Sequence, residues 1–322
     1  MIIYIIGNGF DIGHGLKSEY IDFRNYLKEN DRDFLSWFES LYQINSKYLW
    51  DALEDNIAYT NLLLAWEYLN KNPGPKYGDL DVNNVFNQVF NHRLSTIEKF
   101  PKLFSDWINT LNPDVPRRIS SINKNQNNTS FISFNYTRIL EETYKIPKDR
   151  VFHIHGCVDQ ENLLFGHGYS NIIDDLINDK KKAIDDNNLK NLTIIESLIS
   201  YLKFLYKDTS KQIVQLVDFT SKQGTIEKFK VIGSSISSVD QVYFKILDKI
   251  TGRKVIWEIY YFTKESPYRN QVKSDFKYKL NKATIPDTRI KYISCDKIFD
   301  IENIVNYGDN KNFSTKKLEK VL

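Results

Sequence analysis

Short apolar runs alternate with longer amphipathic stretches along most of this chain. Residues 2 to 6 form a continuous apolar run, Ile-Ile-Tyr-Ile-Ile, that stops at Gly7. A short β-branched run of this kind is typical of a strand buried on both faces of a parallel sheet. The same pattern predicts further strands over residues 131–134, 151–154, 229–232, 255–262 and 290–293, with residues 163–165 as a candidate for one more.

Helical spacing of apolar residues separates these runs. It predicts helices over residues 17–29, 137–145, 239–250 and 266–282. Two longer segments, about 34–111 and about 171–222, are also helical in pattern. Alternation of strands and helices is typical of a parallel sheet covered by helices.

The sequence therefore predicts a single Rossmann-like α/β domain over residues 1–322. The segment about 34–111 is a large helical insertion, and about 171–222 is a second helical segment. The insertion stands where a dinucleotide-binding domain would place its second strand. A lid, an oligomerisation surface and a sensor would all give this pattern. A polar C-terminal tail is expected over about 305–322.

Composition excludes several classes of protein. A net charge of +3, from 44 basic and 41 acidic residues, gives no reason to expect a nucleic-acid partner. The first apolar run is too short for a signal peptide or a membrane helix. The two cysteines, Cys157 and Cys295, fit reduced thiols better than a disulfide framework. We expect a cytoplasmic protein without a membrane partner.

Four of the five histidines lie in glycine-flanked segments that follow predicted strands. These segments are Gly13-His14-Gly15, His153-Ile154-His155-Gly156 and Gly166-His167-Gly168. Glycine allows sharp turns and close approach to a ligand, and histidine titrates near neutral pH. The pattern predicts one site assembled from loops at strand ends, and favours an enzyme.

The first glycine segment is the best candidate for binding phosphate. It runs from Gly7 to Gly15 with glycines spaced as GxGxxxG. A glycine loop between a strand and a helix presents backbone N–H groups to an anion. Tight packing is the alternative, and the density of glycine favours the phosphate-binding interpretation.

Asn135 stands at the end of the second predicted strand, within Ser-Phe-Asn-Tyr-Thr. Ligands of open parallel sheets bind beyond such strand ends, where an asparagine can orient a ribose hydroxyl, an amide or a water. It could equally cap the following helix. Both interpretations remain open. Similarly, Gly233-Ser234-Ser235 with Asp240 could contact a ribose or phosphate, or could begin a helix.

His153 and His155 are alternate residues of a predicted strand and should share one face. One could act as a general base supported by the other. Both could instead bind a metal together with His167, His14 or Asp11. A purely structural role is the third interpretation, and the nearby glycines make it the weakest.

Taken in order, these segments resemble a known family. IIGNGFDIGHGLKSEYIDF, SFNYT, HIHG and FGHG resemble the bacteriophage abortive-infection family AbiH, over roughly residues 2 to 250. The resemblance implies a role in bacterial defence, in which the infected cell is shut down or killed.

That family is in turn similar to the sirtuin-like proteins that consume NAD. The corresponding parts here are Gly7 to Gly15 with Phe23-Arg24, then Asn135, His155-Gly156 and Gly233-Ser234-Ser235. The resemblance implies a sirtuin-like core in which His155 deprotonates a ribose hydroxyl and Asn135 positions the nicotinamide ribose or the attacking water. Gly7, Gly9 and Ser235 would hold the phosphates and the adenosine half. A zinc-ribbon cysteine quartet is missing from the sequence, so protein deacylation is not expected.

The leading hypothesis is thus cleavage of NAD(+), as substrate, or of a related nucleotide, with no metal. His155, Asn135 and His153 are the predicted catalytic residues. The predicted nucleotide-binding residues are Gly7, Asn8, Gly9, Phe10, Asp11, His14, Phe23, Gly156, His167, Gly233, Ser234, Ser235 and Asp240. The alternatives are a metal-dependent phosphoesterase or nuclease, and a non-catalytic nucleotide sensor. Expected partners are a small nucleotide, with a second copy of the chain or a phage-derived trigger as further candidates.

Overall fold

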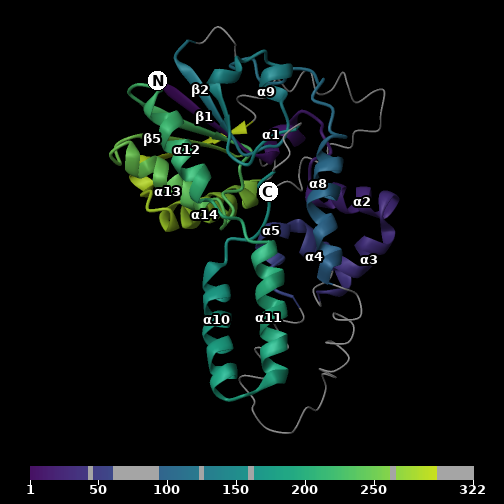
Figure 1. Ribbon diagram of the computed structural model, residues 1–322. Coiled ribbons are helices and arrows are strands. Elements are labelled where there is room, and N and C mark those ends of the chain that lie inside the picture. The colour runs from purple at the N-terminus through teal and green to yellow at the C-terminus, as the bar shows by residue number, and fades with distance from the viewer. Residues whose placement is uncertain (43–45, 61–93, 123–126, 159–162, 262–265, 296–322) are drawn as a thin grey trace. The chain divides into compact units, whose positions relative to one another are not determined.

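A computed structural model describes residues 1–42, 46–60, 94–122, 127–158, 163–261 and 266–295 (Figure 1). The chain divides into two compact units. The sheet unit comprises Met1–Glu19, Ile108–Leu163 and Thr209–Leu322. The helical unit comprises Tyr20–Trp107 and Leu164–Asp208.

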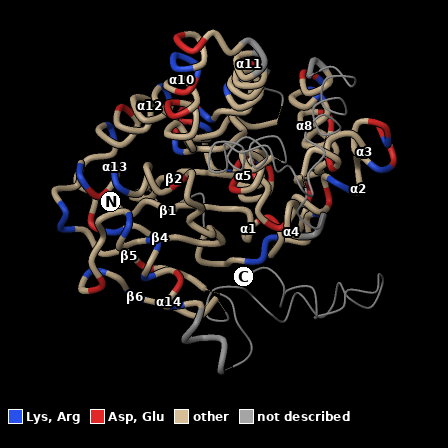
Figure 2. The backbone as a smooth tube through the Cα atoms, turned by 90° about the horizontal axis from the view of Figure 1, so that it is seen from below, with Lys and Arg blue, Asp and Glu red and all other residues tan. Residues whose placement is uncertain are grey.

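The sheet unit is built on six parallel strands in the order β3-β2-β1-β4-β5-β6. Figure 2 shows most of them in succession, from β2 through β1, β4 and β5 to β6. This is the strand order of the Rossmann fold, so the predicted Rossmann-like α/β class is confirmed. The strands are β1 (Ile2–Ile6), β2 (Thr129–Ser133), β3 (Val151–His153), β4 (Lys228–Ile232), β5 (Ile256–Tyr261) and β6 (Ile290–Ser294).

Strand β1 lies at the centre because its run of apolar residues can be buried on both sides. Ile5 is paired with Ile132 of β2 and with Val231 of β4. Alternate strand residues, among them Ile3, Phe229 and Trp257, form one buried cluster. The Phe229 and Trp257 rings stack there at 4.4 Å. The helices whose apolar residues complete this cluster are α12 (Ser210–Ser221), α13 (Gln241–Ile250) and α14 (Ser266–Lys282).

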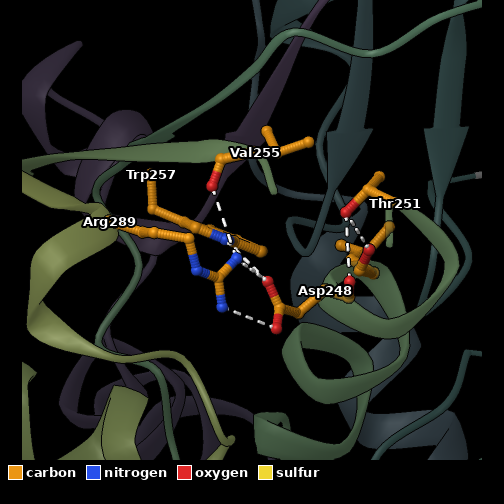
Figure 3. A network of polar contacts seen from close by, with 6 residues as sticks. Asp248, Thr251, Val255, Trp257 and Arg289 are labelled. Carbon is orange, nitrogen blue, oxygen red and sulfur yellow. Dashed lines mark hydrogen bonds and ion pairs between the residues drawn. The ribbon is translucent and has the colours of Figure 1, made fainter. Parts of the chain in front are cut away.

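A buried ion pair joins the end of α13 to the start of β6 (Figure 3). The Arg289 guanidinium donates to both carboxylate oxygens of Asp248, which is fully buried. Trp257 Nε1 donates to the same carboxylate at 3.3 Å. Bidentate pairing and an indole donor satisfy a charge that would be costly to bury alone.

The other short elements of this unit are α1 (Asn8–Gly13), α9 (Ile139–Glu142), η2 (Lys148–Arg150) and η3 (Asp287–Arg289).

The helical unit has a core rich in aromatic residues. Phe23 is fully buried, with the Trp50, Phe100, Phe104 and Trp107 rings 5.1–5.8 Å from its own. Figure 1 shows α10 and α11 as two adjacent helices. The elements of this unit are α2 (Tyr20–Asn30), α3 (Arg32–Ser40), α4 (Ser46–Asp51), α5 (Leu53–Asn56), η1 (Leu94–Lys99), α8 (Phe100–Ile108, whose last residue belongs to the sheet unit), α10 (Ser170–Asp185) and α11 (Leu189–Phe204).

Three local predictions differ from the structure. Residues 163–165 do not form a strand; the nearest pairing is an isolated bridge between His167 and Tyr206. The glycine segment is not an open loop, because helix α1 begins at Asn8, directly after Gly7. The predicted second helical segment is divided, since α10 and α11 belong to the helical unit and α12 to the sheet unit. Residues 61–93 of the predicted insertion and the tail 305–322 lie outside the described residues.

Among the described residues, none of the helices has both the length and the apolar character needed to cross a bilayer.

Candidate functional site

The candidate site lies in the sheet unit, where parallel strands end on one edge of the sheet. Gly7 follows β1, Asn135 follows β2, and His155 follows β3. Gly233 follows β4, which lies beside β1 at the point where the strand order reverses. Ligands of open α/β sheets bind at this position, beyond the carboxyl ends of the strands.

Close packing between the segment after β1 and the segment after β4 accounts for three of the glycines. A Cβ on Gly233 would lie 2.2 Å from Phe10 N, and one on Gly9 would lie 2.8 Å from Gly233 Cα. The N–H groups of Gly7 and Gly9 donate to the carbonyls of Ile232 and Gly233, at 2.9 and 2.7 Å. Tight packing is thus a sufficient reason for glycine at these positions, and phosphate binding by this segment stays a prediction. Backbone contact requires the glycines, and two of the N–H groups are already used.

Asp11 and Asn135 form a buried polar cluster beside these loops. Asn135 Nδ2 donates to Asp11 Oδ1 at 2.6 Å and to the Gly7 carbonyl at 3.1 Å. Thr137 Oγ1 donates to Asp11 Oδ2 at 2.6 Å. Burial raises the pKa of the Asp11 carboxyl to about 7, against the hydrogen bonds from Thr137 and Asn135, which lower it.

Asn135 does not cap the following helix, so that interpretation is wrong. Arg138 occupies the N-cap position of α9, and the Asn135 side chain donates instead to Asp11 and to the Gly7 carbonyl. Its Oδ1 atom is buried and has no hydrogen-bond partner among the described residues. A buried acceptor left without a partner is destabilising, and such atoms are typical of places where a ligand binds.

His155 is the second residue at this edge with an unsatisfied polar atom. Its ring is 4 % exposed, and Nε2 lies 3.3 Å from Asp240 Oδ1 without hydrogen-bond geometry to any described residue. The Phe134 ring meets it edge-on at 5.3 Å. Ser237 Oγ donates to the other oxygen of Asp240 at 2.8 Å. An imidazole beside an oriented carboxylate can accept a proton and have the resulting charge stabilised.

His153 has a different role from His155. Its Nδ1 lies 3.1 Å from the Asn135 carbonyl oxygen, and its Nε2 lies 2.7 Å from Glu141 Oε1. Each ring nitrogen therefore lies beside an acceptor oxygen, and the His153 ring connects Asn135 to Glu141. The second oxygen of Glu141, Oε2, is buried without a partner among the described residues.

The prediction that His153 and His155 share one strand face is wrong. Strand β3 ends at His153, so the alternation of side chains does not extend to His155. A turn follows at Gly156, whose φ of 81° is unfavourable for other residues. The two rings consequently meet different carboxylates, Glu141 and Asp240.

Both ring nitrogens of His14 have partners within the protein, and its assignment to the nucleotide stays a prediction. Its Nδ1 donates to the Phe10 carbonyl and its Nε2 accepts from Tyr144 Oη, both at 2.7 Å. Burial lowers the pKa of His14 to about 4, so the ring is neutral at physiological pH. The Phe10 ring is also buried, 4.4 Å from the His14 ring.

His167 and Phe23 belong to the helical unit and are satisfied inside it. His167 Nε2 donates to the Leu202 carbonyl at 3.0 Å, while Nδ1 accepts from Tyr169 N at 3.2 Å. Burial lowers the pKa of His167 to about 4. Both nitrogens of this ring have protein partners, and its assignment to a nucleotide or metal stays a prediction. Phe23 lies in the aromatic core of the unit.

The remaining predicted nucleotide-binding residues are Asn8, Ser234 and Ser235, which lie on the segments after β1 and β4. Asn8 and the Ser18 hydroxyl bond to each other at 2.6 Å. Ser234 Oγ accepts from Ile236 N at 3.2 Å, and the Ser235 carbonyl accepts from Lys279 at 3.0 Å.

In the part of the chain that the structure describes, His, Cys, Asp and Glu do not come together in groups of three or more suited to a metal ion. A cavity of about 550 Å³ lies between the start of β3 and helix α12. Its lining includes Asp149, Arg150, Phe152, Asp218 and Lys222, and contains none of the predicted residues.

Thr137 and Glu141 belong to the candidate site but were not predicted. Thr137 is two residues beyond Asn135, and Glu141 lies in the first turn of a predicted helix. Sequence spacing alone gave no signal for either residue, because their partners, Asp11 and His153, are distant along the chain or on another element.

Residues 3–261 match the family model described as "Bacteriophage abortive infection AbiH". Neither the curated proteins nor the solved structures contain a match to the chain. The family match confirms the first resemblance seen in the sequence; the likeness to sirtuin-like proteins stays a prediction.

Proposed function

The chain belongs to the bacteriophage abortive-infection family AbiH, and from this premise we propose that it cleaves NAD(+) or a related nucleotide. Its role is in defence against phage. The proposed reaction adds water to C1′ of the nicotinamide ribose and breaks the bond from C1′ to the nicotinamide nitrogen. The products are ADP-ribose, nicotinamide and a proton.

One observation supports this proposal above the others. Asn135 Oδ1 and His155 Nε2 are both buried and both without a hydrogen-bond partner among the described residues. They belong to residues that follow the neighbouring strands β2 and β3. An unpaired buried polar atom costs about 1–3 kcal/mol. Two of them at one sheet edge are explained if a polar ligand supplies their partners.

In this mechanism His155 is the general base. It removes a proton from a ribose hydroxyl or from the attacking water, and Asp240, 3.3 Å from Nε2, stabilises the imidazolium. Asn135 Oδ1 accepts a hydrogen bond from the same hydroxyl or water. The surrounding Phe134 and Tyr243 rings keep the imidazole in an apolar setting, where these interactions are strengthened.

The phosphates need donors other than the N–H groups of Gly7 and Gly9, which already bond to the protein. Ser234 and Ser235 remain the proposed contacts for the phosphates or the adenosine half. The Ser234 hydroxyl accepts from Ile236 N, and its own proton can still be donated to a ligand.

The test is the NAD content of cells that express the chain, with and without phage. We compare wild type with His155→Gln and Asn135→Ala at equal expression, with Lys222→Ala as a control at an exposed position. Wild type and control should deplete NAD on infection and protect the culture. Loss of a general base lowers turnover by about 10²–10⁴-fold, so the two site variants should do neither.

Assays of purified protein distinguish NAD(+) cleavage from nucleotide sensing without catalysis. Release of nicotinamide from NAD(+) that His155→Gln abolishes would support the proposal. Protection with intact NAD and other nucleotides would overturn it. A sensor without catalysis predicts nucleotide binding without turnover, and protection that survives in His155→Gln.

A further inference from the structure

The Asn135 side chain has donors and an acceptor with very different surroundings. Both protons of Nδ2 have acceptors, Asp11 Oδ1 at 2.6 Å and the Gly7 carbonyl at 3.1 Å. The acceptor Oδ1 has no partner among the described residues, although the residue is 95 % buried. The donors of this amide are therefore used within the protein and the acceptor is not.

Rotating the Asn135 amide by a half turn would lose hydrogen bonds. Exchanging Oδ1 and Nδ2 would place an acceptor oxygen against the Asp11 carboxylate and against the Gly7 carbonyl. The Gly7 carbonyl is always an acceptor and the ionised Asp11 carboxylate is one, so with Asp11 ionised two hydrogen bonds would become two repulsive contacts. A hydrogen bond to a charged group is worth about 1.5–3 kcal/mol. The orientation that leaves Oδ1 without a partner is thus strongly preferred.

Asp11 is itself held in place. Its second carboxylate oxygen accepts from Thr137 Oγ1 at 2.6 Å, and its main chain lies in helix α1, directly after β1. The side chain is 2 % exposed. A carboxylate fixed at both oxygens fixes the amide that bonds to it.

We propose that Asp11 is a positioning residue, which holds Asn135 so that the amide oxygen and not the amide NH₂ is presented to the nucleotide. This inference rests on the proposed function and adds a specificity to it. The site should prefer ligands that bring an O–H or N–H donor to Asn135. A nucleotide lacking that donor leaves a buried acceptor unpaired, and sites of this kind reject such analogues strongly.

The experiment measures binding of NAD(+) and of its analogues lacking the 2′- or 3′-hydroxyl of the nicotinamide ribose. The measured quantity is the ratio of dissociation constants, deoxy analogue over NAD(+), from calorimetry. Wild type should prefer NAD(+) over at least one analogue by about tenfold or more. Asp11→Ala and Asn135→Ala should bring this ratio close to one.

Two further variants separate positioning from folding. Asp11→Asn can still accept from Asn135 Nδ2 and can donate to Thr137, so it should keep the ratio. Asp218→Asn, at an exposed carboxylate, is the matched control and should also keep it. If circular dichroism shows that Asp11→Ala does not fold, Thr137→Val is measured in its place. The ratio of dissociation constants for Thr137→Val should be lower than that for wild type.

The outcomes distinguish this inference from the function on which it rests. Wild-type protein that binds none of the three nucleotides overturns the proposed function and the inference together. Wild-type protein that cleaves NAD(+), with a ratio unchanged in Asp11→Ala or Thr137→Val, overturns only the role of Asp11.

Discussion

At the scale of single residues, hydrogen-bond partners separate the histidines into two kinds. His14 and His167 have both ring nitrogens satisfied by protein atoms, and burial lowers the pKa of each to about 4. His153 and His155 meet carboxylates at the sheet edge. All four lie in the glycine-flanked segments, so a nearby glycine did not discriminate between structural and functional rings.

Asp11 should give folding stability a distinct pH dependence. Burial raises its folded-state pKa to about 7 from the ordinary value of 3.8. Between these values the folded chain holds a proton that the unfolded chain has released. The contribution of Asp11 to the free energy of unfolding is therefore greatest below the lower value, and falls by up to about 1.4 kcal/mol per pH unit as pH rises toward 7.

Urea unfolding at about pH 5, 6 and 7 measures this effect. Asp11→Asn has no proton to exchange, so its stability relative to wild type should improve steadily as the pH rises through this range. Asp218→Asn should run parallel to wild type. If the free energies of unfolding of wild type and Asp11→Asn also change in parallel with pH, burial does not raise the pKa of the Asp11 carboxyl as described.

At the scale of elements, the central contact is between the segment after β1 and the segment after β4. Helix α1 begins at once after Gly7, and Gly9 N donates to the Gly233 carbonyl. The two backbones approach too closely for side chains at these positions. Close approach brings Asp11, Asn135 and the serines after β4 to the same edge of the sheet.

Gly233→Ala and Gly252→Ala form a matched pair that tests this contact. Gly233 has φ 69° and Gly252 has φ 67°, so both variants bear the same backbone strain, about 1–2 kcal/mol. A Cβ at Gly252 meets no atom within 4 Å, whereas one at Gly233 lies 2.2 Å from Phe10 N. Gly233→Ala should lose a further 1–3 kcal/mol, about the usual penalty for overpacking. Equal losses in urea unfolding would contradict the close approach.

At the scale of the whole molecule, each unit is assembled from segments that are far apart in the chain. The sheet unit combines three segments and the helical unit combines two. Strand β1 pairs with β2, more than 120 residues later, and with β4, more than 220 residues later. The candidate site therefore forms only when these distant segments are folded together.

Native-state hydrogen exchange should reflect this assembly. Amides of β1, which is hydrogen-bonded on both sides, should exchange only through global unfolding. Amides of the edge strands β3 and β6 should exchange at least about tenfold faster, through local opening. Exchange from β1 as fast as from the edge strands would show that the sheet opens locally at its centre.

Much of this architecture could be predicted from the sequence. Buried strands and amphipathic helices leave periodic patterns, so all six strands and the helices α2, α9, α13 and α14 were predicted within a few residues. The helices of the two long helical segments were not predicted one by one. Asn135, His153 and His155 could be placed at one sheet edge because strand ends in parallel sheets gather there, whereas their catalytic roles stay a prediction. The candidate strand at 163–165 was wrong because a short apolar segment gives too little pattern to identify a strand.

The sequence by itself determined the family, the α/β class and the residues at the strand ends, because these depend on local composition and order. Tertiary structure alone decided the partner of each polar atom. Gly7 and Gly9 pack closely against the backbone after β4, His14 is hydrogen-bonded to Tyr144, and Asp11 is hydrogen-bonded to Asn135. Hydrogen bonds and close contacts join residues over 100 positions apart, and periodicity along a chain contains no information about such distances.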